Sequence, residues 1–71
     1  MKATYELENI VLVIPHIVEI EILDEKNAFF VFSYPQRHPT FCFESEEQMV
    51  EAKNDLVKAI NEFYEQRKLA L

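Results

Sequence analysis

The 71-residue chain is 49% hydrophobic with a formal net charge of −6, which gives room for one domain (residues 1–71) and excludes intrinsic disorder. It has no basic stripe to attract phosphate groups, so we expect neither direct nucleic-acid binding nor membrane binding. The high apolar content of so short a chain favours a homodimer, and its acidity suits a basic protein partner.

The first part of the chain predicts strands. Residues 3–8 alternate, with Tyr5 and Leu7 on one face, and residues 10–14 form a continuous apolar run that we expect to be buried on both sides. Pro15 interrupts this run and indicates an edge, a bulge or a bend. The chain contains no glycine, so its turns must use Asn, Asp and Pro.

Two further strands are expected around a hairpin loop. Residues 16–23 alternate, and this predicts that three of their side chains face the core: Val18, Ile20 and Ile22. In the loop at residues 24–27, Asn27 is the best candidate for a left-handed backbone. The strand at residues 28–33 contains four consecutive large apolar residues, Phe29 to Phe32. This run predicts that both faces of the strand are covered, or that one face meets a partner.

Residues 40–43 predict a short last strand, in which Phe41 and Phe43 point the same way and Cys42 is half-buried. A single cysteine excludes an intrachain disulfide, whereas a secreted domain of this size normally contains several cysteines. The N-terminus turns acidic by Glu6 and lacks a signal-peptide profile. We therefore expect a cytoplasmic protein.

Residues 45–68 predict one long helix, for which Ser45 is the N-cap and Gln48 completes a capping box. Apolar residues recur on it at spacings of three and four: Met49, Ala52, Leu56, Ile60 and Phe63. The predicted fold is α+β, with a three- or four-stranded antiparallel meander over residues 3–43 and the helix packed on one sheet face. The other sheet face is expected to meet a second copy.

The residues that carry a family resemblance are Phe41-Cys42-Phe43, Ser45-Glu46-Glu47-Gln48, Leu56 and Ala59-Ile60. Through them the segment from about Ile17 to Ile60 resembles the C-terminal half of a pleckstrin-homology-like domain, where an aromatic strand leads through an acidic cap into a long helix. Ala52 stands where that family has a helix Trp, and the basic first hairpin of lipid-binding members has no counterpart. The resemblance implies a half-barrel that binds proteins and is completed by a second copy.

Catalytic and metal sites are not expected. The only soft ligand candidates are His16, His38 and Cys42, and their spacing matches no zinc site. Nucleophilic catalysis by Cys42 would need an orienting group and an oxyanion hole, which a chain without glycine-rich loops does not offer. We therefore expect no enzymatic activity, no metal and no cofactor.

Two surfaces are candidates for binding. The segment 33–39 contains two prolines and presents residue types that are common in interfaces: Tyr34, Gln36, Arg37 and His38. The alternative is a connection whose polar residues only contact solvent. The second surface is acidic and comprises Glu19 and Glu21 on a strand with Glu51, Asp55 and Glu62 on the helix. Its alternative is an ordinary solvated face.

The sequence fits two functions. The first is a small, acidic, non-catalytic protein-interaction module that forms a homodimer. The second is an acidic inhibitor of the phage type, which mimics nucleic acid and blocks a basic nucleic-acid-binding protein. Such a mimic needs acids in a row at phosphate-like spacing, and its binding should collapse with salt. A small enzyme is a third class, but it would need a pocket that the sequence does not locate.

Overall fold

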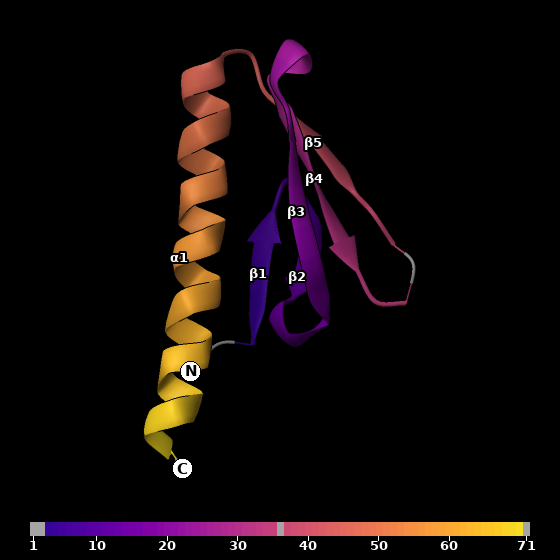
Figure 1. Cartoon of the computed structure of the whole chain (residues 1–71). Helices are drawn as coiled ribbons and strands as arrows, with labels where there is room; N and C mark the ends of the chain where they lie inside the picture. Colours follow the sequence, from indigo (N-terminus) through magenta and orange to yellow (C-terminus); the bar gives the residue numbers. More distant parts are fainter. Residues whose placement is uncertain (1–2, 36, 71) are drawn as a thin grey trace.

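The structure is a computed structural model that describes residues 3–35 and 37–70. Strands β1 (Thr4–Leu7) and β2 (Ile10–Val13) form a two-stranded antiparallel sheet, and β3 (Ile17–Leu23), β4 (Ala28–Ser33) and β5 (Thr40–Cys42) form a three-stranded antiparallel meander. Short 3-10 turns precede and follow β3 at η1 (Ile14–His16) and η2 (Asp24–Lys26), and the helix α1 (Glu46–Ala70) completes the order. Figure 1 shows α1 running alongside the strands. The predicted α+β class, with one C-terminal helix on a sheet, is confirmed.

Because the chain contains no glycine, residues of other types adopt the left-handed backbone conformation at its turns. Glu8 and Asn9 have φ angles of 48° and 69°, as a two-residue type I′ hairpin turn between β1 and β2 requires. Asn27 has φ 48° just before β4, which confirms the prediction for that residue. Asparagine is enriched in this region of φ/ψ space, whereas glutamate has no such preference.

Only alternate residues of the apolar run 10–14 reach the core. Leu12 and Ile14 are buried, but Ile10, Val11 and Val13 are 36%, 57% and 37% exposed. The expectation that this run is buried on both sides is therefore wrong. The second face of the small β1–β2 sheet is open to solvent. Because side chains alternate along a strand, those of Val11 and Val13 lie on this open face.

An irregularity in β3 changes which of its residues face the core. The register of β3 on β4 shifts between Ile17 and Glu19, so Val18 bulges outward and is 74% exposed. Ile17 and Ile20 pack against the core, while Ile22, opposite Phe29, is 39% exposed on this edge strand. The expectation that Val18 faces inward is wrong because a bulge inserts one residue and resets the alternation.

One apolar cluster joins both sheets to the helix. Its buried members are Leu12, Phe29, Val31, Phe41, Met49 and Leu56. The ring of Phe29 lies 5.5 Å from that of Phe41 and 5.7 Å from that of Phe43, between centroids, so Phe41 and Phe43 point the same way as predicted. On the opposite face of β4, Phe30 and Phe32 stay partly exposed with ring centroids 4.9 Å apart.

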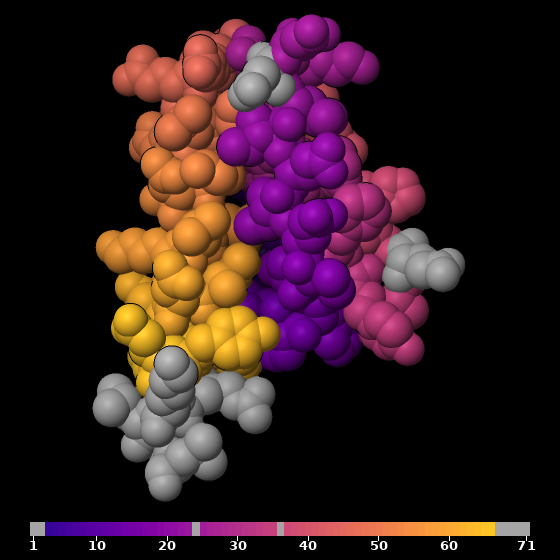
Figure 2. All heavy atoms as spheres, viewed as in Figure 1, coloured from indigo at the N-terminus to yellow at the C-terminus, as the bar shows by residue number. Residues whose placement is uncertain are grey.

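The helix begins at the predicted cap. The Gln48 N–H donates to Ser45 Oγ at 3.2 Å, and Gln48 Oε1 accepts from the Glu44 N–H at 3.3 Å, one residue earlier than a standard capping box. Met49, Leu56 and Phe63 are buried beneath α1, and Ala52 and Ile60 pack beside them. In Figure 2 the side chains of α1 lie directly against those of the strands. Within the described residues, no helix is both long and apolar enough to cross a bilayer.

The phenol of Tyr5 couples β1 to the helix electrostatically. Burial, and secondly the negative charge of Asp55 on α1, raise the pKa of Tyr5 above its ordinary value of 10.0. The folded state thus holds the phenolic proton more tightly than the unfolded state does. This contribution to stability is complete below the unfolded pKa and is lost as the pH rises through the higher folded pKa.

We therefore expect the free energy of unfolding of the wild type to fall more steeply above about pH 10 than that of Tyr5→Phe, which has no proton to lose. Urea unfolding followed by circular dichroism at a series of alkaline pH values measures this difference. Tyr34→Phe is the matched control, because Tyr34 is 70% exposed. Equal slopes for wild type and Tyr5→Phe would contradict the assignment.

Candidate functional site

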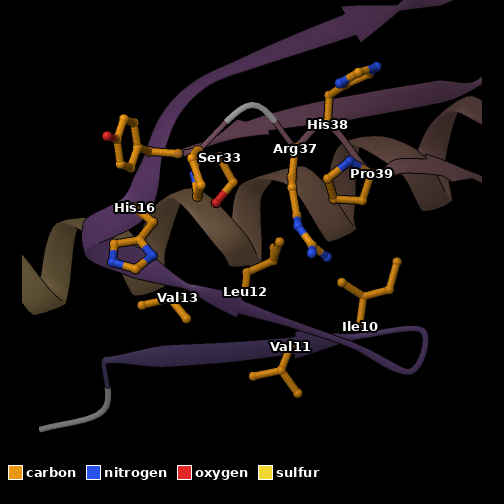
Figure 3. A pocket seen from close by; sticks show the side chains of 11 residues that line it. Ile10, Val11, Leu12, Val13, His16, Ser33, Arg37, His38 and Pro39 are labelled. Atoms are coloured by element: carbon orange, nitrogen blue, oxygen red, sulfur yellow. The ribbon is translucent and has the colours of Figure 1, made fainter.

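A cleft of about 720 Å³ lies between β2 and the connection from β4 to β5 (Figure 3). This is within the usual size range of ligand pockets. One wall comes from β2, the other from the segment 33–39, and an exposed histidine of η1 lies at one end. The described lining residues are Ile10, Val11, Leu12, Val13, His16, Ser33, Tyr34, Pro35, Arg37, His38 and Pro39.

Backbone hydrogen bonds hold the described residues of the segment 33–39 in place. Ser33 and Arg37 exchange two bonds, with the Ser33 N–H donating at 2.7 Å and the Arg37 N–H at 2.8 Å. The Val31 N–H donates to the Pro39 carbonyl at 3.1 Å, and the Tyr34 N–H donates to the His16 carbonyl at 2.7 Å. The side chains of Tyr34 and Arg37 are therefore presented from a hydrogen-bonded backbone, which lowers the entropy lost when a ligand binds.

The lining side chains have distinct directions. In Figure 3 the guanidinium of Arg37 extends from the segment 33–39 across the cleft toward β2, where Ile10 and Leu12 point back at it. His38 turns the other way, and its ring centroid lies 5.8 Å from that of Phe32. Arg37 is thus the charged group that a ligand in the cleft would meet first.

The cleft differs in charge from the rest of the molecule. The chain carries 13 acidic residues against 7 lysines and arginines, yet no described lining residue is acidic. Arg37 forms no ion pair with any carboxylate in the part of the chain that the structure describes. An acid-free cleft with an unpaired guanidinium favours anionic ligand groups.

Apolar exposure is also concentrated here. Among the described residues, the exposed large hydrophobic side chains are Ile10, Val11, Val13, Val18, Ile22, Tyr34, Val50 and Tyr64. Four of these eight, Ile10, Val11, Val13 and Tyr34, line the cleft. Exposed apolar groups that gather at one site mark interaction surfaces, whereas isolated ones are normal.

The structure brings three of the four predicted recognition residues to this cleft: Tyr34, Arg37 and His38. The fourth, Gln36, lies outside the described residues. The β2 wall and His16 were missed, because nothing in the sequence indicates that a segment near residue 12 faces one near residue 36. The two prolines of the segment 33–39 indicate it in the sequence, whereas no local pattern indicates the β2 wall across the cleft.

The predicted acidic surface is divided between two layers. Glu19 and Glu21 pair across strands with Phe32 and Phe30, so they lie on the sheet face that points away from α1. The exposed helix residues Glu51, Asp55 and Glu62 belong to the other layer of the molecule. The fold does not bring these two groups together.

Cys42 is exposed, so the expectation of a half-buried thiol is wrong. Neighbouring residues of a strand point to opposite faces, and Phe41 occupies the core face of β5. Among the described residues, no group of three or more His, Cys, Asp or Glu side chains is arranged to hold a metal ion.

Comparison of the chain with models of known protein families, with curated proteins and with solved structures gave no significant match.

We expect Arg37→Ala to change the free energy of unfolding by no more than about 0.5 kcal/mol, because its side chain is exposed and makes no ion pair with the described residues. Urea denaturation of the two proteins measures the difference. A loss of several kcal/mol would mean that Arg37 supports the loop, and the guanidinium would then not be free to meet a ligand.

Proposed function

We propose that this chain is a small, acidic, non-catalytic protein-interaction module that works as a homodimer and holds a partner in the cleft between β2 and the segment 33–39. The observation that carries this proposal is that four exposed apolar residues, Ile10, Val11, Val13 and Tyr34, line the same cleft as Arg37. Exposed aromatic and apolar groups around an arginine are the composition of binding hot spots.

The chemistry of the lining supports binding rather than catalysis. Two histidines border the cleft, but its described lining offers no carboxylate to orient an imidazole and no thiol to act as a nucleophile. Nucleophilic catalysis with a histidine base needs such a third group to position the base.

Support for the homodimer comes from the amount of surface left exposed. The chain exposes 5441 Å², roughly 800 Å² more than the area of about 4,650 Å² that the size relation for folded monomers gives at its mass of 8.5 kDa. A typical stable interface buries about 800 Å² on each partner. A second copy would bring the exposed area per chain into the ordinary range.

The dimer surface that we propose is the face of the β3–β4–β5 sheet that points away from α1, called here the outer sheet face. Phe30 and Phe32 lie at its centre on β4, and Glu19 and Glu21 lie on the edge strand β3. Protein interfaces usually have aromatic residues at the centre and charged residues at the margin. Val18, Phe32 and Tyr34 line a shallow hollow of about 420 Å³ at one end of this face.

The acidic-inhibitor function has less support from the geometry. A nucleic-acid mimic needs one continuous row of carboxylates, and here Glu19 and Glu21 are separated from the helix acids by the thickness of the molecule. Salt distinguishes the two functions, because a charge-driven complex is lost at high ionic strength and an apolar one is retained.

The cleft is tested by capture of partners on the tagged chain from lysate of the source cell, at low and at high salt. We expect Ile10→Asp to reduce the amount of captured partner at least tenfold, because it puts a carboxylate into the cleft opposite Arg37, while Val50→Asp keeps it. Val50, on α1, lies outside the cleft and is 37% exposed. Equal capture by wild type and Ile10→Asp would place binding elsewhere, and capture only at low salt would favour the inhibitor.

The dimer is tested by sedimentation equilibrium over a wide range of concentrations. We expect the wild type to have twice the mass of the chain, and Val18→Asp to weaken association at least tenfold, because Val18 is 74% exposed on the proposed interface. Val50→Asp, the same change on the helix, should associate like the wild type. A wild type that is monomeric throughout the range would rule the dimer out.

A further inference from the structure

The hydrogen-bonding register of the first hairpin shows which backbone groups of β2 are paired. The turn at residues 8–9 makes Leu7 and Ile10 a hydrogen-bonded pair, and alternate pairs along the ladder follow, ending in the bond from the Ile14 N–H to the Ala3 carbonyl at 2.8 Å. The backbone groups of Ile10, Leu12 and Ile14 therefore point to β1. Those of Val11 and Val13 point the other way, and β2 pairs with no second strand among the described residues.

The unpaired edge of β2 borders the cleft. Four consecutive residues of β2 line it, from Ile10 to Val13. Successive side chains of a strand point to opposite faces, so a cavity over one face would touch only alternate residues. A cavity that touches all four lies along the edge, where the N–H and C=O groups of Val11 and Val13 emerge.

The edge of β2 lacks the features that keep the edges of β3 and β5 from pairing with another chain. The exposed edge strand β3 carries a bulge at Val18 together with Glu19 and Glu21, and β5 is only three residues long. Bulges, charges and short length are the usual means of preventing a strand edge from pairing with another chain. The edge of β2 carries two exposed valines and no charge.

The charges around the cleft favour an anionic ligand group. The guanidinium of Arg37 reaches across the cleft toward β2, no described lining residue is acidic, and the molecule outside the cleft is strongly acidic. A neutral peptide would leave Arg37 without a partner in a partly enclosed site, whereas a carboxylate can accept two parallel bonds from its guanidinium.

We propose that the cleft binds an extended peptide segment that pairs with the free edge of β2 through the backbone groups of Val11 and Val13, and that a carboxylate side chain of this segment contacts Arg37. The inference rests on the proposed function and specifies its partner. Backbone pairing supplies affinity in such strand addition, and the side-chain contacts supply selectivity. Exposed apolar groups of the β2 wall receive the alternate side chains of the segment.

The selectivity is tested with a displayed library of random linear peptides, selected on the full-length chain. We expect the enriched sequences to share an acidic residue within an extended apolar pattern. Selection on Arg37→Gln should lose the acidic preference, whereas Lys58→Gln, which removes an exposed charge on α1, should retain it. Enrichment without an acidic residue, or an acidic preference that survives in Arg37→Gln, overturns the proposal.

The pairing is tested by amide hydrogen exchange with one enriched peptide, observed residue by residue by NMR. In the free protein the amides of Val11 and Val13 should exchange faster than that of Leu12, which is bonded to β1. Binding should slow Val11 and Val13 by at least tenfold and leave an exposed helix amide outside the cleft unchanged. Methylation of alternate peptide nitrogens should abolish binding at every second position only, which is the signature of a strand.

Other outcomes of these experiments would overturn strand addition or identify a different occupant of the cleft. Unchanged exchange at Val11 and Val13, or a methylation pattern with the period of a helix, overturns strand addition. Protection of these two amides in the absence of peptide that disappears on dilution would identify a second copy as the occupant and overturn the peptide. A library that yields no binder overturns the inference alone, because loss of the captured partner in Ile10→Asp would still support the proposed function.

Discussion

The packing of one helix across two separate sheets is the constraint on which this fold depends. Leu12 from the first hairpin and Phe29, Val31 and Phe41 from the meander all bury against Met49 and Leu56. The two sheets share no strand pairing, so they are held together by this common contact, by η1 and by the Tyr34–His16 backbone bond. Apolar burial of this kind is worth about 25 cal/mol per Å², and the cluster that joins the two sheets includes Met49 and Leu56 of this one helix.

The same arrangement explains why a cleft exists. Two sheets that are joined on one side by the helix and on the other only by a short turn need not close into a barrel. The edge of β2 and the connection between β4 and β5 then lie on opposite sides of the cleft. The cleft is a consequence of short strands, because β1, β2 and β5 have four residues or fewer. Segments this short cannot wrap far enough to meet.

Local features of the fold were predictable from the sequence, and distant contacts were not. The N-cap at Ser45, the left-handed Asn27 and the helix stripe follow from rules that act over a few residues, and all are present. Predictions of burial fail where tertiary surroundings determine the exposure of a side chain. At Val18 a bulge resets the alternation, and at Val11 and Val13 one face of an apolar run is open to solvent. Likewise the segment 33–39 was recognisable, whereas its counterpart on β2 depends on tertiary geometry that no local pattern encodes.

The three left-handed residues at the chain reversals have a consequence for how this protein can vary. A residue other than glycine in this region stores about 1 kcal/mol of conformational strain, less for asparagine, and a glutamate at residue 8 has no compensating preference. For a chain of 71 residues such an amount is a sizeable share of the total stability. The turns are therefore positions where substitution can adjust the robustness of the fold in either direction, outside the buried cluster that joins the sheets to the helix.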